Sequence, residues 1–480
     1  MKKLISKALP ILLVLCLLAG CKNIADGPLG LLVGLGNSTD GPSGTGSDSV
    51  ISSLEGDAAK MAELFGEDYV VERLEWEEKN NPYEIPADLK GTTVEFATWL
   101  DPRIDICKYA VAIFEETTGM KLQWVEIPQT GYTEKLASLV ASGSAPDVYF
   151  DNGNQFTTVL KLAKPLDEVK SINLEDPIWD KDVLKYTTFN GHPYEINTRN
   201  SLNAAGDYIV FYNKRILEEN GVKTPAEYIE EGAWTIDAMI NVMREYSALG
   251  DNYYGGYVEP QYLAAASGTA IIKMENGRFV SGLNDAALHE AYKKYIEWNA
   301  EGLFNASAIT GGIVKGTHGL VLNTTYGLKA GGTFKGVDGD MLGFAPIPSV
   351  DGSATSYTAA KWNAYGILNN SKNPEGAGYF LRCMLDPYNY NIDEIFISTD
   401  ARDYYFKNAC GTAFDKKVFM YDQSITPLLG YAWDNNGLRT WDYKLMRTKV
   451  AQFATTVASI ENEVTTGVNK ANEILDGLKK

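Results

Sequence analysis

Apolar and polar residues from position 92 onward follow a strand period of about two and then a helix period of about 3.6. Thr92–Trp99 alternates, with Val94 and Phe96 on one side, and helical spacing then continues to Gly119, a typical helix C-terminus. This order occurs twice more. Its predicted members are the strands Lys121–Ile127 and Asp147–Phe150, the helix Tyr132–Ser142 and a helix that ends at Leu162. Such alternation predicts a parallel sheet covered by helices.

A second series of elements begins with the strand Tyr208–Tyr212 and the helix Lys214–Asn220. Further along the chain, the patterns predict one strand and several helices. They are the strand Met341–Ala345, the helices Ile236–Ala248 (N-cap Thr235) and Asp285–Trp298 (N-cap Asn284), a helix from Asn373-Pro374 with Ala377, Phe380, Leu381 and Met384 inward, and a helical tail from Lys444. The length of the chain is sufficient for two such α/β units.

The N-terminal segment has the pattern of an export signal. Three lysines precede the apolar run Leu9–Leu18, which is shorter than the roughly 20 residues of a membrane span. Leu18-Ala19-Gly20-Cys21 resembles the bacterial lipobox, in which the cysteine becomes the lipid-modified first residue. We expect residues 1–20 to be the signal peptide; the alternative is an ordinary secretory signal with an incidental cysteine.

Residues 21–90 are predicted to be a lipid-anchored tether followed by a short helix. Lys22–Ser53 is rich in Gly, Ser, Asp and Pro, a composition that buries too little apolar surface to fold. Ala58–Glu78 has the pattern of one helix with an acidic face, and Pro82 and Pro86 then interrupt the chain. The expected location is therefore the extracellular face of the cell membrane.

Composition and charge exclude several functions. Hydrophobic residues make up 45% of the 480-residue chain, which is typical of a globular protein, and the formal net charge is −19. This charge repels phosphate backbones and anionic headgroups, so no nucleic-acid partner is expected and membrane contact is assigned to the lipid.

Metal and redox motifs are weak in this sequence. Beyond Cys21, the cysteines Cys107, Cys383 and Cys410 lack a Cys-x-x-Cys spacing; Cys383 and Cys410 either pair or, as we prefer, remain isolated thiols. Three histidines give no metal-binding spacing. We therefore predict no cofactor and no metal site, although Asp and Asn loops leave a structural calcium ion open.

The order of several segments resembles that of extracellular solute-binding protein family 1, the lipid-anchored receptors of bacterial ABC importers that include maltose-binding protein. The resemblance runs from about Gly91 to the C-terminus. The segments that carry it are Thr93-Val-Glu-Phe-Ala-Thr-Trp, Phe114-Glu-Glu-Thr-Thr-Gly, Gly143-Ser-Ala-Pro-Asp-Val-Tyr-Phe, Phe211-Tyr-Asn-Lys, Lys315-Gly-Thr-His-Gly-Leu-Val-Leu and Ser371-Lys-Asn-Pro-Glu-Gly-Ala. Each segment alone is unspecific, but their common order and spacing are specific.

The resemblance implies an α/β, two-lobed periplasmic-binding-protein-like fold of type II. Each lobe is expected to be a mainly parallel sheet flanked by helices, with hinge strands between the lobes. On this chain, lobe 1 is placed at residues 91–200 and 355–398 and lobe 2 at residues 201–354 and 399–480. The implied partners are a small-molecule solute, chiefly an oligosaccharide, and ABC permease subunits, and the receptor is expected to be a monomer.

Candidate ligand-binding residues combine aromatic faces, which stack on a sugar ring, with polar groups for its hydroxyls. Ligands of open α/β sheets lie at the carboxyl ends of the strands, which here are followed by Trp99, Asp101, Arg103, Asp151, Asn152 and Asn154. The other reading is that Trp99 packs under the next helix, that Asp101 caps it, and that the later residues form an ordinary turn.

Five further candidate residues come from the resemblance. Tyr257-Val-Glu-Pro-Gln-Tyr resembles the Glu-Pro-Tyr segment of the maltose-binding branch, which implies ligand roles for Glu259, Gln261 and Tyr262. Tyr326 falls where that branch has a stacking Trp; the alternative is that Tyr326 is a core aromatic. Trp362 precedes a strand that re-enters lobe 1; the alternative is that Trp362 packs in the hinge. Trp234 is interpreted as structural.

Other ligand classes and an enzyme remain as alternatives. A peptide, a polyamine or a uronate would use the same mechanism, with Arg103 and Lys361 pairing an acidic sugar. A secreted carbohydrate-active enzyme is disfavoured, because no Gly-x-Ser-x-Gly, Ser-x-x-Lys or phosphate-binding glycine motif occurs. We therefore assign no catalytic residue.

Overall fold

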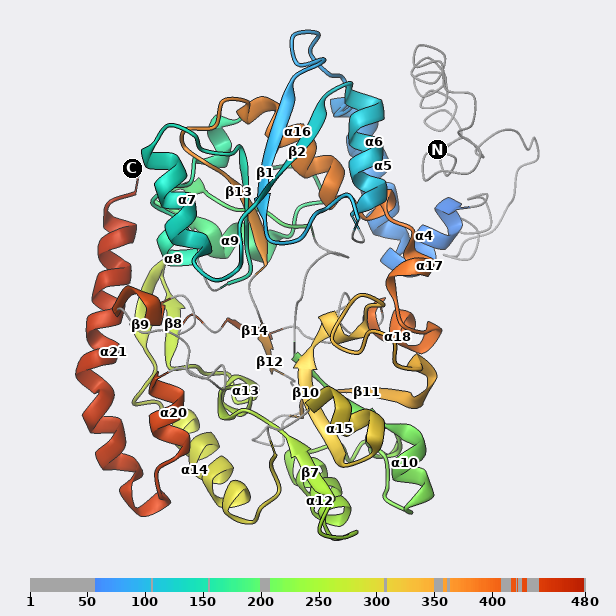
Figure 1. The fold of residues 1–480 in the computed structure, drawn as a ribbon, viewed down its shortest axis with the longest axis vertical. Helices are drawn as coiled ribbons and strands as arrows, with labels where there is room; N and C mark the ends of the chain where they lie inside the picture. The colour runs from blue at the N-terminus through green and yellow to red at the C-terminus, as the bar shows by residue number, and fades with distance from the viewer. Residues whose placement is uncertain are drawn as a thin grey trace. The chain divides into compact units, whose positions relative to one another are not determined.

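The computed structural model describes most of the chain after residue 56, in two compact units. The described residues are 57–104, 107–153, 156–198, 208–305, 309–348, 357–360, 363–406, 416–419, 421, 425–429 and 440–478. Unit 1 comprises Met1–Phe150, Leu162–Asn203 and Tyr365–Glu394, and unit 2 comprises Asp151–Lys161, Ala204–Ala364 and Ile395–Lys480. Each unit is an α/β assembly (Figure 1).

Unit 1 contains a four-stranded sheet in the order β13-β3-β1-β2. Its elements are α4 (Asp57–Phe65), α5 (Glu67–Asn80), β1 (Thr93–Thr98), α6 (Lys108–Thr118), β2 (Lys121–Glu126), α7 (Tyr132–Ala141), β3 (Val148–Asp151), α9 (Lys181–Thr187), β4 (Thr188–Phe189), β5 (His192–Pro193), β13 (Ala364–Ile367), α16 (Pro374–Leu385) and α17 (Ile392–Ile395). Strand β1 is parallel to both β2 and β3, which confirms the predicted parallel sheet.

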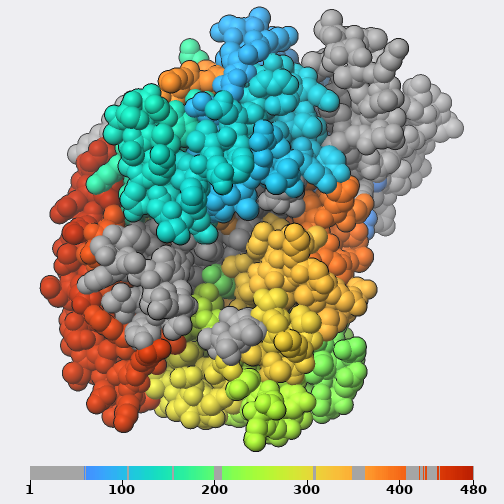
Figure 2. Space-filling view, viewed as in Figure 1, coloured from blue at the N-terminus to red at the C-terminus, as the bar shows by residue number. Residues whose placement is uncertain are grey.

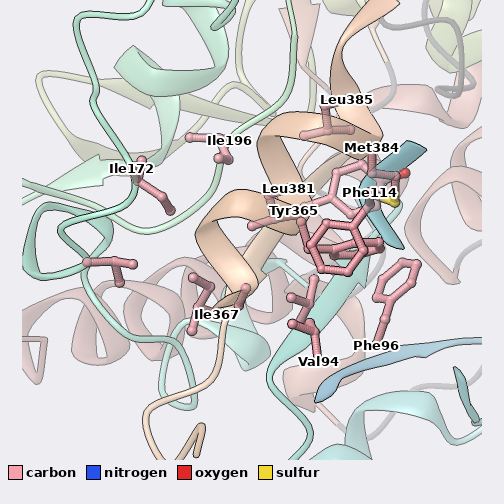
Figure 3. Close-up of a cluster of buried hydrophobic side chains, with 14 of the residues drawn as sticks. Val94, Phe96, Phe114, Ile172, Ile196, Tyr365, Ile367, Leu381, Met384 and Leu385 are labelled. Carbon is pink, nitrogen blue, oxygen red and sulfur yellow. The ribbon is translucent and has the colours of Figure 1, made fainter. Parts of the chain in front are cut away.

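The core of unit 1 lies between this sheet and α16. Phe96 of β1 contacts Phe380 of α16 and Tyr365 of β13, with ring centroids 5.5 and 6.0 Å apart. The four α16 residues that were predicted to face inward are all fully buried, and Figure 3 shows members of this cluster converging from several elements. Gly119 ends α6 with a left-handed backbone (φ 70°), as predicted.

Unit 2 contains a four-stranded sheet in the order β11-β6-β10-β7. Its elements are α8 (Phe156–Val159), β6 (Tyr208–Asn213), α10 (Lys214–Glu219), α11 (Pro225–Glu230), α12 (Ile236–Ser247), β7 (Tyr254–Tyr257), α13 (Pro260–Ala266), β8 (Ile272–Glu275), β9 (Arg278–Ser281), α14 (Ala286–Ala300), α15 (Ile309–Lys315), β10 (His318–Thr324), β11 (Leu342–Pro346), β12 (Tyr357–Ala360), α18 (Thr399–Tyr404), β14 (Lys416–Phe419), α20 (Thr440–Met446) and α21 (Phe453–Asp476). Strand β6 is antiparallel to β10 and β11, whereas β7 is parallel to β10.

The C-terminal helix α21 packs on the β8–β9 hairpin of unit 2. Asn472 accepts a hydrogen bond from the Phe279 amide at 3.0 Å and donates one to the Phe279 carbonyl at 2.9 Å. Helix α21 also packs on α20, its outward face is exposed, and Figure 2 shows this red segment at the surface. The predicted tail helix is therefore present, although it begins at Phe453 after a separate α20.

Three local predictions were wrong. The helix expected over Ala58–Glu78 is broken into α4 and α5 at Gly66, whose φ of 90° is incompatible with a continuous helix. The helix expected to end at Leu162 is only the four-residue α8. Asn284 does not cap α14: the N-cap is Asp285, and the Asn284 amide donates to Glu461 instead.

Helix α5 is attached to the core of unit 1 by buried charges. The Arg73 guanidinium donates two hydrogen bonds of 2.6 Å to the Asp386 carboxylate and one of 3.0 Å to Glu77. Arg382 of α16 donates to the same Glu77 and to Asp176, at 3.0 and 2.8 Å. Two arginines and three carboxylates therefore form one network that joins α5 to α16.

Candidate functional site

In unit 2, several candidate residues lie at one edge of the sheet. The register pairs Thr324 with Tyr208 and Val321 with Tyr257, so the end of β10, the start of β6 and the end of β7 lie at the same edge. Strand β7 leads directly to Glu259, the N-cap residue of α13. This is the carboxyl edge of the two parallel strands, where open α/β sheets bind their ligands.

Glu259 is the centre of a hydrogen-bonded cluster at this edge. The Tyr257 hydroxyl donates to Glu259 Oε1 at 2.6 Å, and the Gln261 side-chain amide donates to Glu259 Oε2. Burial, followed by the charge of Glu259, raises the pKa of Tyr257, so this phenol remains a protonated donor. The carboxylate is therefore held in place from both sides by neighbours on its own segment.

Tyr262 lies against Tyr208 rather than presenting an open face. The two rings are stacked with centroids 3.9 Å apart, and each residue is only 6% exposed. Burial, followed by the charge of Glu259, also raises the pKa of Tyr262. The pair forms an aromatic wall beside the carboxylate, with one ring from β6 and one from α13.

Tyr326 lies just beyond the end of β10, in a short 3-10 helix over Thr325–Leu328. Its ring is half-buried, and its hydroxyl donates to the Gly331 carbonyl at 3.0 Å. Trp234 donates its indole N–H to the Pro346 carbonyl at the end of β11, at 2.8 Å. This contact agrees with the structural interpretation of Trp234.

In unit 1, Trp99 follows β1 and is held by two other aromatic rings. Its centroid is 5.3 Å from that of Tyr132, edge to face, and 5.0 Å from that of Phe150. Tyr132 is the first residue of α7, and its hydroxyl donates to the Ala97 carbonyl at 2.8 Å. Trp99 remains half-buried, so part of the indole is accessible at the carboxyl end of β1.

Asp101 and Arg103 form an ion pair with each other. The Arg103 side chain donates two hydrogen bonds to the Asp101 carboxylate, at 2.9 and 2.7 Å, and its backbone N–H donates a third at 3.0 Å. These bonds to Arg103 hold the pKa of Asp101 below its ordinary value. The alternative that Asp101 caps the next helix is wrong, because the N-cap of α6 is Cys107.

Asp151 is the last residue of β3 and Asn152 follows it, and both are buried. Asp151 Oδ1 accepts a hydrogen bond of 2.7 Å from the Gly153 amide, which closes a tight turn. The predicted residues Asn154 and Trp362, and Lys361, lie outside the described residues.

Two residues of the unit 2 cluster, Tyr208 and Tyr257, were not among the sequence candidates. Tyr208 reaches Tyr262 only because β6 runs antiparallel to β10, a pairing that local periodicity does not encode. Tyr257 could have been predicted from the sequence, because it lies two residues before Glu259. Alternation places both side chains on the same side of an extended segment.

Within the described residues, no group of His, Cys, Asp and Glu side chains is arranged to hold a metal ion. In the same part of the chain, no helix has both the length and the apolar character needed to cross a membrane. Cys107 is buried and accepts a hydrogen bond from the Tyr390 hydroxyl, and burial raises the pKa of Cys383. Cys410 lies outside the described residues.

The fold is that of the two-lobed periplasmic sugar-binding proteins. The galacto-N-biose/lacto-N-biose I-binding protein of the ABC transporter from Bifidobacterium longum matches with a TM-score of 0.59 and 14% identity over 80% of this chain and 99% of that chain. The sequence profile of the bacterial extracellular solute-binding protein family matches residues 76–389, more than half of the chain. The chain therefore belongs to the bacterial extracellular solute-binding protein family.

Two other solved structures show the same similarity of fold. The sugar-binding protein MalE from Xanthomonas citri has a TM-score of 0.58 and 16% identity, over 81% of this chain and 100% of that chain. An ABC substrate-binding protein from Listeria monocytogenes, in complex with cycloalternan, has a TM-score of 0.53 and 16% identity over the same shares. A search of curated proteins gave no significant match. The Bifidobacterium neighbour is the binding protein of an ABC transporter, and the Listeria neighbour is an ABC substrate-binding protein.

Proposed function

We propose that this chain is the lipid-anchored extracellular substrate-binding component of an ABC transporter. It captures a sugar or an oligosaccharide between its lobes and delivers it to the permease. The observation that carries the ligand class is the cluster of Tyr257, Glu259, Gln261 and the stacked Tyr208–Tyr262 pair at the carboxyl edge of the unit 2 sheet. Family membership and the sugar complexes of the neighbouring structures support the transport role.

The unit 2 cluster has the chemistry that a neutral sugar requires. A carboxylate accepts hydrogen bonds from hydroxyl groups, and such charge-assisted bonds are about twice as strong as neutral ones. Because Tyr257 and Gln261 fix both oxygens of Glu259, little side-chain entropy is lost when a ligand binds. Tyr326, near the end of β10, is proposed to supply an aromatic surface for the apolar face of a ring.

Residues of the other lobe, and residues outside the described part of the chain, complete the proposed site. Trp99 is proposed to stack on the ligand, and the paired Asp101 and Arg103 to bind hydroxyls at the edge of the same loop. The remaining proposed ligand residues are Asp151, Asn152, Asn154 and Trp362. Closure of the lobes around the sugar would exclude water and strengthen these hydrogen bonds.

A thermal-shift screen of the full chain in detergent tests this function. The panel contains neutral oligosaccharides, uronates, peptides and polyamines. A ligand at a hundredfold its Kd adds about 2.7 kcal/mol to the free energy of unfolding, which is readily measured. We expect a neutral oligosaccharide to raise the melting temperature, and we expect Glu259→Gln to abolish most of that rise.

The matched control is Glu230→Gln, which makes the same chemical change at an exposed residue at the end of α11. The control is expected to keep the full ligand-induced rise. Stabilisation by peptides or polyamines, with none by any oligosaccharide, would overturn the proposed ligand class. An equal loss of the rise in both variants would overturn the role of Glu259.

A further inference from the structure

The hydroxyl of Tyr132 bridges two strands of unit 1 at the carboxyl edge of the sheet. It donates a hydrogen bond of 2.8 Å to the Ala97 carbonyl of β1 and accepts one of 3.1 Å from the Phe150 amide of β3. The β1–β3 register ends with the pair Ala97 and Tyr149, so the hydroxyl contacts both strands where their pairing ends. Because Tyr132 is only 1% exposed, this phenol is placed for its hydrogen bonds within the protein.

Tyr132 supports the Trp99 indole in two ways. Its own ring meets the indole edge to face, with centroids 5.3 Å apart. The Phe150 ring lies 5.0 Å from the indole, and the Phe150 amide is the group that donates to the Tyr132 hydroxyl. Aromatic pairs at these distances attract each other. Tyr132 therefore contacts Trp99 directly and also holds the strand that carries the second ring.

The backbone before Trp99 is held from the other side by β2. The Thr98 carbonyl accepts one hydrogen bond of 3.0 Å from the Trp124 indole N–H and another of 3.2 Å from the Ile127 amide. Leu100, the residue after Trp99, is 50% exposed. The support of the indole therefore comes from the strand side of Trp99 rather than from the loop that follows it.

We propose that Tyr132 is a positioning residue, which holds the Trp99 indole ready to stack on the bound sugar without contacting the sugar itself. This inference rests on the proposed function and deepens it. A side chain that becomes ordered only when the ligand binds lowers affinity, for one such side chain by about 2- to 10-fold. An indole that Tyr132 already holds in the ligand-free protein avoids this loss.

Tyr132→Phe is the informative variant, because it removes the bridging hydroxyl and keeps the ring. We expect the ends of β1 and β3 to loosen, the indole to become mobile and the affinity to fall by about 2- to 10-fold. The matched control is Tyr390→Phe in the same unit. Tyr390 is 3% exposed, and its hydroxyl donates to the Met384 carbonyl at 2.5 Å. A loss of affinity that reflects only a less stable unit 1 would therefore occur in both variants.

The first measurement is fluorine NMR of the full chain in detergent, labelled with fluorotryptophan and without ligand. The Trp99 resonance is assigned by its absence in Trp99→Phe. In Tyr132→Phe we expect this resonance to narrow and to shift toward its position in the urea-unfolded protein. In Tyr390→Phe we expect it to stay where it is in the wild type.

The second measurement is isothermal titration calorimetry with the oligosaccharide that gives the largest thermal shift in the screen. It compares wild type, Tyr132→Phe, Tyr390→Phe, Trp99→Ala and the double variant of Tyr132→Phe with Trp99→Ala. Because Tyr132 acts through the indole, Tyr132→Phe should lower the affinity of the wild type and have no further effect once Trp99 is Ala.

An unchanged Trp99 resonance or an unchanged affinity in Tyr132→Phe would overturn the inference. Equal weakening by Tyr132→Phe with and without the Trp99 indole, or equal weakening by Tyr390→Phe, would also contradict it, since the effect would not pass through Trp99. Failure of every oligosaccharide to bind wild type would instead contradict the proposed function, and the Trp99 resonance would still decide whether Tyr132 holds the indole.

Discussion

Truncation of Arg73 tests the buried charge network that attaches α5 to unit 1. Arg73 is 3% exposed, and its guanidinium lies 3.8 Å from the ring centroid of Tyr388 while it bonds the Asp386 carboxylate twice. Burial lowers the pKa of Arg73, but the charges of Asp386 and Glu77 outweigh this effect and raise it. Arg73 is therefore charged in the folded protein.

The magnitude follows from what the variant leaves behind. In Arg73→Ala, the one basic partner left to Asp386 among the described residues is Arg382, whose Nη1 is 3.9 Å away. Arg382 must also serve Glu77 and Asp176. Removing one partner of a buried ion pair costs about 3–5 kcal/mol, because the remaining charge stays desolvated. For a unit of this size, that corresponds to a fall in melting temperature on the order of 6–20 °C.

The assay is urea unfolding of the full chain, combined with hydrogen exchange at the α5 amides. Hydrogen exchange is needed because a chain with two compact units does not unfold in one step, and the α5 amides report on unit 1. The matched control is Arg215→Ala, which removes an exposed pair with Glu219 at 3.6 Å. That pair should contribute less than about 1 kcal/mol.

A paired replacement separates the loss of charge balance from the loss of packing. In the wild type, the Tyr388 amide donates a hydrogen bond of 3.0 Å to Asp386 Oδ1. Arg73→Met combined with Asp386→Asn removes both charges but keeps a side-chain oxygen that can accept this bond. The double variant should be destabilised by about 1–3 kcal/mol less than the sum of the single variants. Additive effects, or an Arg73→Ala no less stable than Arg215→Ala, would refute the reasoning.

Two further predictions concern the anchor and a buried histidine. Cys21→Ser should release the protein from the membrane fraction, whereas Cys16→Ser, within the expected signal peptide, should not. Cell fractionation measures the release, and the intact mass shows whether the lipid is attached. Burial lowers the pKa of His318, whose Nε2 bonds the Asn305 carbonyl at 3.0 Å. As the pH decreases below about 6.5, His318 takes up a proton in the unfolded chain before it does so in the folded protein, so the free energy of unfolding should fall. In urea unfolding, His318→Asn should reduce this pH dependence.

The sequence specifies the local elements well where one residue determines a helix end. The Thr235 side chain caps α12 by accepting from the Ala238 amide at 3.2 Å, as predicted. At Gly66 the same local reasoning failed, because an isolated glycine is tolerated inside a helix and nothing nearby indicated its positive φ. At α14, Asn284 and Asp285 are both good caps, and the choice depended on a contact with Glu461, 177 residues away.

The candidate site was less predictable, because its contacts depend on strand register and on distant partners. Periodicity placed Tyr208 at the start of a strand, and the family resemblance supplied Tyr262. The antiparallel pairing of β6 with β10 explains why the two residues meet. Asp101 and Arg103 were two separate candidates, yet their spacing of two residues allows the loop to fold them onto each other. Local pattern thus identifies polar groups near a sheet edge, whereas tertiary pairing determines which of them remain available.

The Arg73 network shows why a family match does not mark the limits of a folding unit. The match begins at residue 76, inside α5, so Arg73 lies before it while Asp386 and Arg382 lie within it. A chain cut at the start of the match would leave Asp386 buried without the guanidinium that bonds it twice. Because an unpaired buried carboxylate costs several kcal/mol and domain stabilities are about 5–15 kcal/mol, such a chain would lose a large part of its stability. Helix α5 therefore belongs to unit 1 on energetic grounds, although sequence similarity places much of it outside the family domain.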